Sequence, residues 1–302
     1  MKKDLISLLD VRDDIFDLLS LAEELKRNKK NGRQLQGQTL AMIFEKSSTR
    51  TRVSFETGMF QLGGNTIYLS QHDSQLGRGE TVADTARVLS RYVDGMIYRA
   101  FDHKNMVELA KHSTVPVINA LDNLEHPCQV MADLLTIKEK KGRLEGLKLA
   151  YVGDGNNVCN SLALGAALMG MDFVAATPKE YAPNASIMDK AASIARTKGH
   201  TCECITDPQI AAKDADVIYT DTWVSMGQER EAHRKEQVMR PYQINDSLMS
   251  LARKDSLFMH CLPAHRGHEV TEEVIEGKHS VVFDQAENRL HAQKAILIKL
   301  MG

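Results

Sequence analysis

Short apolar runs alternate with segments that are apolar on one side only. Residues 11–28 show the second pattern, with apolar side chains at helical spacing at Ile15, Leu18, Leu19, Ala22 and Leu25. The strand-like apolar runs are residues 40–44, 66–69, 95–98, 115–120, 147–152, 173–176, 202–205, 217–220, 257–259 and 281–283. Regular alternation of strands and helices predicts parallel sheets covered by helices.

A polar stretch with two glycines, residues 141–146, interrupts this alternation. A helix-like segment, residues 129–140, leads into it, and strand-like runs resume at residue 147. We therefore predict an α/β fold with two similar-sized domains, residues 1–142 and 147–285, each a parallel sheet flanked by helices. A last helix-like segment follows at residues 286–302.

Composition narrows the class of protein. The 302 residues are 43% hydrophobic and 26% charged, which is typical of a globular protein. A net charge of −2 argues against nucleic-acid binding, and no apolar run is long enough to cross a membrane. The first residues lack a signal-peptide pattern, and the five scattered cysteines favour reduced thiols. We expect a cytoplasmic protein with small-molecule partners.

The segment Ser48-Thr49-Arg50-Thr51-Arg52 lies between a strand-like run and a helix-like segment. The first turn of a helix exposes unpaired N–H groups and a partial positive charge, so hydroxyl and guanidinium groups there favour a phosphate site. Ser and Thr are also common helix caps, so a capped helix without a ligand is an alternative interpretation of the same residues.

Further motifs occur in order along the chain: Tyr98-Arg99, His126-Pro127-Cys128-Gln129, residues 221–227, His260-Cys261-Leu262-Pro263 and Glu287-Asn288-Arg289. With the segment at 48–52, they resemble the carbamoyltransferase family over nearly the whole chain. The Ser-Met-Gly segment at 225–227 and Cys261 are similar to the ornithine branch of that family. The resemblance implies two domains joined by two interdomain helices, with the active site in the cleft and residues 286–302 packing back on the first domain.

The resemblance also implies the reaction. The carbamoyl group of carbamoyl phosphate would pass to the terminal amine of L-ornithine, giving L-citrulline and phosphate without a metal or organic cofactor. Putrescine or another ornithine-like amine is an alternative acceptor, and a non-catalytic ligand-binding protein is an alternative class. The resemblance further implies that this chain forms a homo-oligomer, either a trimer or a multiple of trimers.

Site residues follow from the same resemblance, position by position. Those implied for carbamoyl phosphate are Ser48, Thr49, Arg50, Thr51, Gln75, Arg99, His126, Gln129, Cys261, Leu262 and Arg289. Those implied for ornithine are Asn157, Asp221, Ser225 and Met226. The catalytic residues would be Arg99, His126, Asp221 and Cys261. Gln75 belongs to a loop that would reach into the site of a neighbouring subunit. Some relatives have Lys where this chain has Gly79, and Arg78, one position earlier, would take the place of that Lys.

Two motifs have competing interpretations. Residues 153–157 resemble a dinucleotide-binding turn, but the third glycine position is Val158 and no acidic residue ends the next strand, so an oxidoreductase is not favoured. Cys261 is a covalent nucleophile, a zinc ligand with nearby histidines, or a positioning residue. Because the histidine spacing is poor for zinc and carbamoyl phosphate is already activated, we favour positioning and expect no metal.

Overall fold

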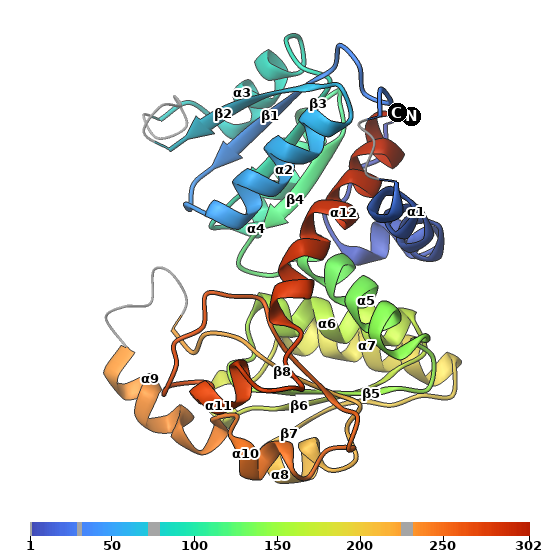
Figure 1. Cartoon of the computed structure of the whole chain (residues 1–302). Helices are drawn as coiled ribbons and strands as arrows, with labels where there is room; N and C mark the ends of the chain where they lie inside the picture. Colours follow the sequence, from blue (N-terminus) through green and yellow to red (C-terminus); the bar gives the residue numbers. More distant parts are fainter. Residues whose placement is uncertain (1, 29–31, 72–78, 225–231) are drawn as a thin grey trace. The chain divides into compact units, whose positions relative to one another are not determined.

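The computed structural model describes residues 2–28, 32–71, 79–224 and 232–302 and divides into two compact units. Unit 1 consists of Met1–Leu135 and Glu287–Gly302, and unit 2 is Thr136–Ala286. Both divisions fall inside helices, α5 (Pro127–Lys141) and α12 (Val282–Met301), so the chain passes between the units through two helices (Figure 1). The predicted linker at 141–146 comes after the first division.

Unit 1 contains a four-stranded sheet with strand order β2-β1-β3-β4, and all its strand pairs are parallel. The strands are β1 (Thr39–Phe44), β2 (Asn65–Ser70), β3 (Gly95–Arg99) and β4 (Val117–Leu121). The helices are η1 (Leu8–Val11), α1 (Ile15–Arg27), α2 (Thr49–Gln61), α3 (Val82–Leu89), α4 (His103–His112) and the first part of α5. The second part of α12 lies beside α1 (Figure 1), where Lys299 pairs with Asp14 at 2.7 Å.

Unit 2 contains a five-stranded parallel sheet with strand order β7-β6-β5-β8-β9. The strands are β5 (Lys148–Val152), β6 (Asp172–Ala176), β7 (Cys202–Ile205), β8 (Val217–Thr220) and β9 (Leu257–His260). The helices are α6 (Asn157–Leu168), η3 (Lys179–Tyr181), α7 (Ala185–Thr197), α8 (Pro208–Ala212), α9 (Ala232–Met239), η5 (Arg240–Tyr242), α10 (Asp246–Met249) and α11 (Glu272–Ile275). The predicted α/β class, with one parallel sheet in each domain, is confirmed.

The strand orders explain why the motifs occur where they do. In unit 1 the order reverses between β1 and β3, and in unit 2 it reverses between β5 and β8. Ligands of open parallel sheets bind beyond the carboxyl ends of the strands at such a reversal. Residues 48–52 follow β1, Arg99 ends β3, residues 153–157 follow β5 and Asp221 follows β8. Each unit therefore presents its motif residues at the position where its topology favours a ligand.

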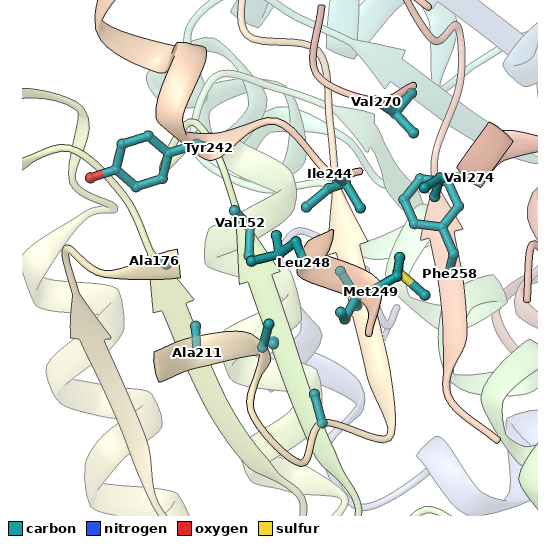
Figure 2. Close-up of a cluster of buried hydrophobic side chains, with 14 of the residues drawn as sticks. Val152, Ala176, Ala211, Tyr242, Ile244, Leu248, Met249, Phe258, Val270 and Val274 are labelled. Atoms are coloured by element: carbon teal, nitrogen blue, oxygen red, sulfur yellow. The ribbon is translucent and has the colours of Figure 1, made fainter. Parts of the chain in front are cut away.

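One core cluster of unit 2 packs a face of the sheet, with residues of β5, β6, β8 and β9, against the short helices α8, α10 and α11. Phe258 of β9 is fully buried and lies close to Met249 and Val274 (Figure 2), while Val152 and Ile244 belong to the same cluster.

No helix in the described ranges is long and apolar enough to cross a membrane.

One predicted strand is wrong. Residues 282 and 283 begin helix α12 and Val281 precedes it, so these residues form no strand; next to them, Ser280 makes an isolated bridge to Phe258. Val282 is buried whereas Phe283 is 65% exposed. A run of three apolar residues is too short to distinguish a strand from the first turn of a helix.

Replacing Phe258 with Ala should lower the free energy of unfolding by about 3–5 kcal/mol, because the change leaves a cavity in a packed cluster. Phe283→Ala, at an exposed position in the same unit, is the matched control and should stay within about 0.5 kcal/mol of the wild type. Urea unfolding of both variants measures the difference, and equal losses would contradict the assignment of the core.

Candidate active site

Helix α2 begins in the Ser-Thr-Arg-Thr motif with a formed cap. The Ser48 hydroxyl accepts a hydrogen bond from the Thr51 N–H at 3.3 Å and donates one to the Thr51 hydroxyl at 3.1 Å. No acidic residue stands in the first turn, whereas Arg50 and Arg52 do. The helix end therefore keeps its partial positive charge and carries cationic side chains next to it, which favours an anion.

Arg99 lies at the end of β3, where the pairing with β4 shifts register between Tyr98 and Arg99. Glu45, directly after β1, anchors this strand end by accepting the Tyr98 hydroxyl and the Phe101 N–H, each at 2.5 Å. The backbone N–H of Glu45 donates to the Arg99 carbonyl oxygen at 2.9 Å. Arg99 itself is 6% exposed, so its side chain is buried beside this anchored strand end.

His126 immediately precedes α5 and is buried. Burial lowers the pKa of its imidazole well below the usual value, and the positive charges of Arg289, Arg99 and Arg50 lower the pKa further. The imidazole is therefore neutral at pH 7 and feels the positive charges of three arginine side chains. Such a group of charges attracts an anion, and the neutral ring supplies a hydrogen-bond donor without adding a fourth cation.

Arg289 of α12 forms hydrogen bonds to both α2 and α5, the helices that begin in the Ser-Thr-Arg-Thr and His-Pro-Cys-Gln motifs. Its Nη1 donates to the Oε1 atom of Gln129 at 2.7 Å, and its Nη2 donates to the Thr51 hydroxyl at 3.2 Å. Gln129 in turn donates from Nε2 to the Asp133 carboxylate at 2.8 Å. All four side chains belong to unit 1 and are at most 3% exposed.

In unit 2 the carboxylate of Asp221 accepts three hydrogen bonds. They come from the Thr222 N–H at 2.8 Å, from Nδ2 of Asn156 at 2.7 Å and from Sγ of Cys261 at 2.9 Å. Asp221 is therefore oriented by donors that follow three different strands, β8, β5 and β9.

The glycine-containing turn after β5 is explained by packing. A Cβ atom on Gly155 would stand 2.2 Å from the backbone nitrogen of Pro183, so only glycine fits. The turn delivers Asn156, which caps α6 by accepting the Val158 and Cys159 N–H groups at 3.0 and 3.2 Å. The side-chain amide of Asn156 is thereby left facing Asp221 with its NH₂ group, and Asn157 becomes the first residue of α6.

A cluster of Asp221, His260 and Cys261 brings together atoms that commonly bind metals, within 4.8 Å of one another. The ring of His260 is engaged on both sides, however. Its Nδ1 accepts the Leu262 N–H at 2.8 Å, so its proton is on Nε2, which faces the buried Glu269 at 3.3 Å. A metal at His260 would have to displace one of these contacts, which favours a positioning role for this segment.

The structure thus places the sequence-predicted residues in two sets. Those that lie in unit 1 are Ser48, Thr49, Arg50, Thr51, Arg99, His126, Gln129 and Arg289. Those that lie in unit 2 are Asn157, Asp221, Cys261 and Leu262. Gln75, Arg78, Ser225 and Met226 lie outside the described residues.

Sequence reasoning missed three residues that hold the predicted ones in place: Glu45, Asp133 and Asn156. Asn156 carried a signal, because Asn before a helix that follows a strand is a common cap. Asp133 lies four residues after Gln129, a helical spacing that places the two side chains on one face. Glu45 had no comparable signal.

Comparison with known proteins follows the same division of the chain. The carbamoyl-phosphate-binding domain of aspartate/ornithine carbamoyltransferases matches residues 3–139, and the Asp/Orn-binding domain matches residues 145–300. The chain belongs to the aspartate/ornithine carbamoyltransferase family. Both domain families are therefore present, in this order.

Individual carbamoyltransferases are similar over the whole chain. An ornithine carbamoyltransferase from Picrophilus torridus is 55% identical over 302 residues, covering 100% of both chains. A catabolic ornithine carbamoyltransferase from Thermoplasma volcanium is 53% identical, covering 100% of this chain and 99% of its own. The solved structure of the Pyrococcus furiosus ornithine carbamoyltransferase superposes with a TM-score of 0.96 at 53% identity, covering 100% and 97%.

A buried carboxyl beside His126 makes stability depend on pH. Burial raises the pKa of Glu125 to about 7, from 4.5. The native state therefore binds this proton more tightly than the unfolded chain, and stability should fall as pH rises from about 4.5 to about 7. Glu125→Gln removes this contribution, so its stability relative to the wild type should rise by up to about 1.4 kcal/mol per pH unit in that window. Urea unfolding across this range measures the slope.

Glu108→Gln, on the exposed side of α4, is the matched control for this experiment and should keep the wild-type slope. If Glu125→Gln also kept the wild-type slope, the raised pKa of Glu125 would be refuted.

Proposed function

We propose that this carbamoyltransferase transfers the carbamoyl group of carbamoyl phosphate to the terminal amine of L-ornithine, giving L-citrulline and phosphate. The observation that carries the proposal is the buried set of Arg99, His126 and Arg289 in unit 1, in which Arg289 also contacts the start of α2 through Thr51. Carbamoyl phosphate combines a doubly charged phosphate with a neutral carbonyl, and this site combines cations with a neutral donor. The full-length similarity to ornithine carbamoyltransferases supports the same substrates.

The phosphate of carbamoyl phosphate would bind at the start of α2. The backbone N–H groups of residues 48–50 and the Thr49 hydroxyl would donate to its oxygens, and the guanidinium groups of Arg50, Arg99 and Arg289 would neutralise its charge. Arginine suits this role because its planar group donates to two oxygens at once. Gln75 lies outside the described residues and remains a proposed phosphate contact from a neighbouring subunit.

The carbamoyl group would be polarised by donors aimed at its oxygen. A neutral His126 donates an N–H, while Arg99 and the Thr51 hydroxyl supply further donors as negative charge develops on this oxygen during attack. The amide oxygen of Gln129 and the carbonyl of Leu262 would accept from the carbamoyl NH₂ group. Because hydrogen-bond donors bind the carbamoyl oxygen and acceptors bind the carbamoyl nitrogen, the orientation of the carbamoyl group toward the attacking amine is fixed.

Ornithine would bind to the residues of unit 2. Asp221 pairs with the α-ammonium group, Asn157 contacts the amino-acid end, and Cys261 lies next to the reacting amine. Ser225 and Met226, outside the described residues, are proposed to contact the same substrate. Because three donors already orient the Asp221 carboxylate, it meets the ammonium group in a defined direction.

The reaction itself needs little covalent participation by the protein. The nitrogen lone pair of the neutral terminal amine attacks the carbonyl carbon, the bond between this carbon and the phosphate oxygen breaks, and the departing phosphate accepts the proton that nitrogen loses. No atom of the protein enters a covalent bond. Arg99, His126 and Thr51 lower the barrier by holding the developing oxyanion, and Asp221 and Cys261 by orienting the amine.

The acceptor and the assembly complete the proposal. Putrescine is not favoured, because it lacks the α-ammonium group that Asp221 would bind and the relatives are named for ornithine. We propose a cytoplasmic homotrimer, or a multiple of trimers, that works without a cofactor in arginine metabolism.

Citrulline formation tests the proposal directly. Carbamoyl phosphate is incubated with L-ornithine, putrescine, N-acetylornithine or L-aspartate, and we expect product only with ornithine. Arg99→Ala should lower turnover about 10²- to 10³-fold, since it removes a donor to the developing charge, while the exposed Arg91→Ala should remain at the wild-type rate. Product with another amine alone would overturn the assignment of ornithine.

The contact between Asn156 and Asp221 gives a second prediction. Asn156→Asp keeps a cap for α6 but replaces the NH₂ donor with a second carboxylate, so the KM for ornithine should rise about tenfold while the KM for carbamoyl phosphate is unchanged. Asn184→Asp is the matched control, because Asn184 caps α7 in the same unit. An unaltered KM for ornithine in Asn156→Asp would show that this contact does not orient Asp221.

A further inference from the structure

Four buried side chains in unit 1 form a continuous hydrogen-bonded series. Thr51 and Gln129 both accept from Arg289, and Gln129 donates to Asp133. Asp133 is fully buried in α5, one helical turn beyond Gln129. Asp133 stands outside the set of residues that the motifs predict to bind a substrate.

The orientation of the Gln129 amide is determined at both ends. A guanidinium group can only donate, so the atom of Gln129 that faces Arg289 must be the oxygen. The NH₂ group then faces the carboxylate of Asp133, which accepts it at 2.8 Å. Turning the amide over would place two donors against each other at Arg289 and two oxygens against each other at Asp133.

We propose that Asp133 is a positioning residue for Gln129, and that Arg289 occupies the Gln129 oxygen until a phosphate group withdraws the guanidinium. This inference rests on the proposed function, since it concerns how carbamoyl phosphate is recognised. When phosphate binds, Arg289 exchanges a neutral amide oxygen for an anionic oxygen, and hydrogen bonds between two ions are stronger. The released oxygen of Gln129, with its amide still held by Asp133, then accepts from the carbamoyl NH₂ group.

The exchange makes recognition of the NH₂ group depend on recognition of the phosphate. Acetyl phosphate carries a methyl group where carbamoyl phosphate carries NH₂, so it would draw Arg289 away and leave the Gln129 oxygen without a donor. A buried acceptor left unsatisfied costs about 1–3 kcal/mol, which corresponds to about 5- to 150-fold in affinity. Preference for carbamoyl phosphate over acetyl phosphate is therefore the property that Asp133 should control.

Binding of three probes to the full-length protein, without ornithine, tests the role of Asp133. Calorimetry gives the Kd for carbamoyl phosphate, acetyl phosphate and inorganic phosphate. Asp133→Leu should reduce the preference for carbamoyl phosphate over acetyl phosphate about tenfold and leave the Kd for inorganic phosphate within about twofold. Asp133→Asn, which can still present an oxygen to Gln129, should retain most of the preference. A wild-type preference in Asp133→Leu would overturn the positioning role.

Gln129→Leu tests the exchange by Arg289 and does not depend on whether Asp133→Leu folds. With no amide oxygen to leave, Arg289 should bind phosphate more readily, so inorganic phosphate should bind about three- to tenfold tighter than in the wild type, and the preference for carbamoyl phosphate should be lost. Unchanged or weaker phosphate binding would overturn the exchange.

These binding measurements are separate from catalysis. A wild type that binds carbamoyl phosphate in preference to acetyl phosphate but forms no citrulline contradicts the proposed function and leaves the roles of Asp133 and Arg289 intact. A wild type that binds both acyl phosphates equally overturns the inference even if citrulline is formed.

Discussion

The guanidinium group of Arg289 is the contact on which the substrate-binding region of unit 1 depends. It bonds to Thr51 in α2 and to Gln129 in α5, and it is contributed by α12, far away in the sequence. A buried cation without partners would be very costly, so the two helices must present their oxygens to it for the unit to be stable. The same requirement leaves the group attractive to an anion, because neutral oxygens satisfy a cation less well than phosphate does.

The candidate site in unit 1 contains both charged and neutral hydrogen-bond donors. Three arginines supply positive charge, and His126 stays neutral because it is buried and because their charges disfavour a further cation. If the imidazole were itself a cation, repulsion from the arginines would destabilise the empty site. The neutral ring can instead donate to a carbonyl, which is a weaker acceptor than phosphate but is the group that reacts. In the proposed binding mode, the phosphate and the carbamoyl group would therefore have different kinds of partner within one unit.

The sequence predicted most of this arrangement where local pattern determines structure. Apolar runs located the nine strands of the described sheets, and motifs identified Arg99, His126 and Asp221 at strand ends or before helices. The partners that orient those residues were not predictable in the same way. Asn156 reaches Asp221 only because Gly155 lets the turn pack closely, and Glu45 holds the end of β3 through a strand pairing that is distant in sequence. Local pattern also failed at residues 281–283, where three apolar residues at the start of a helix have the same pattern as a short buried strand.

The division of unit 1 into two segments has a consequence for biosynthesis. Its sheet is encoded before unit 2, yet Arg289 and the rest of α12 are encoded after it. On the ribosome, unit 1 therefore stays incomplete until all of unit 2 has been synthesised. Until then Thr51 and Gln129 lack their hydrogen bonds with Arg289. Unit 2, which is continuous in sequence, can fold before unit 1 is complete, and the proposed phosphate site would form only when α12 packs onto unit 1.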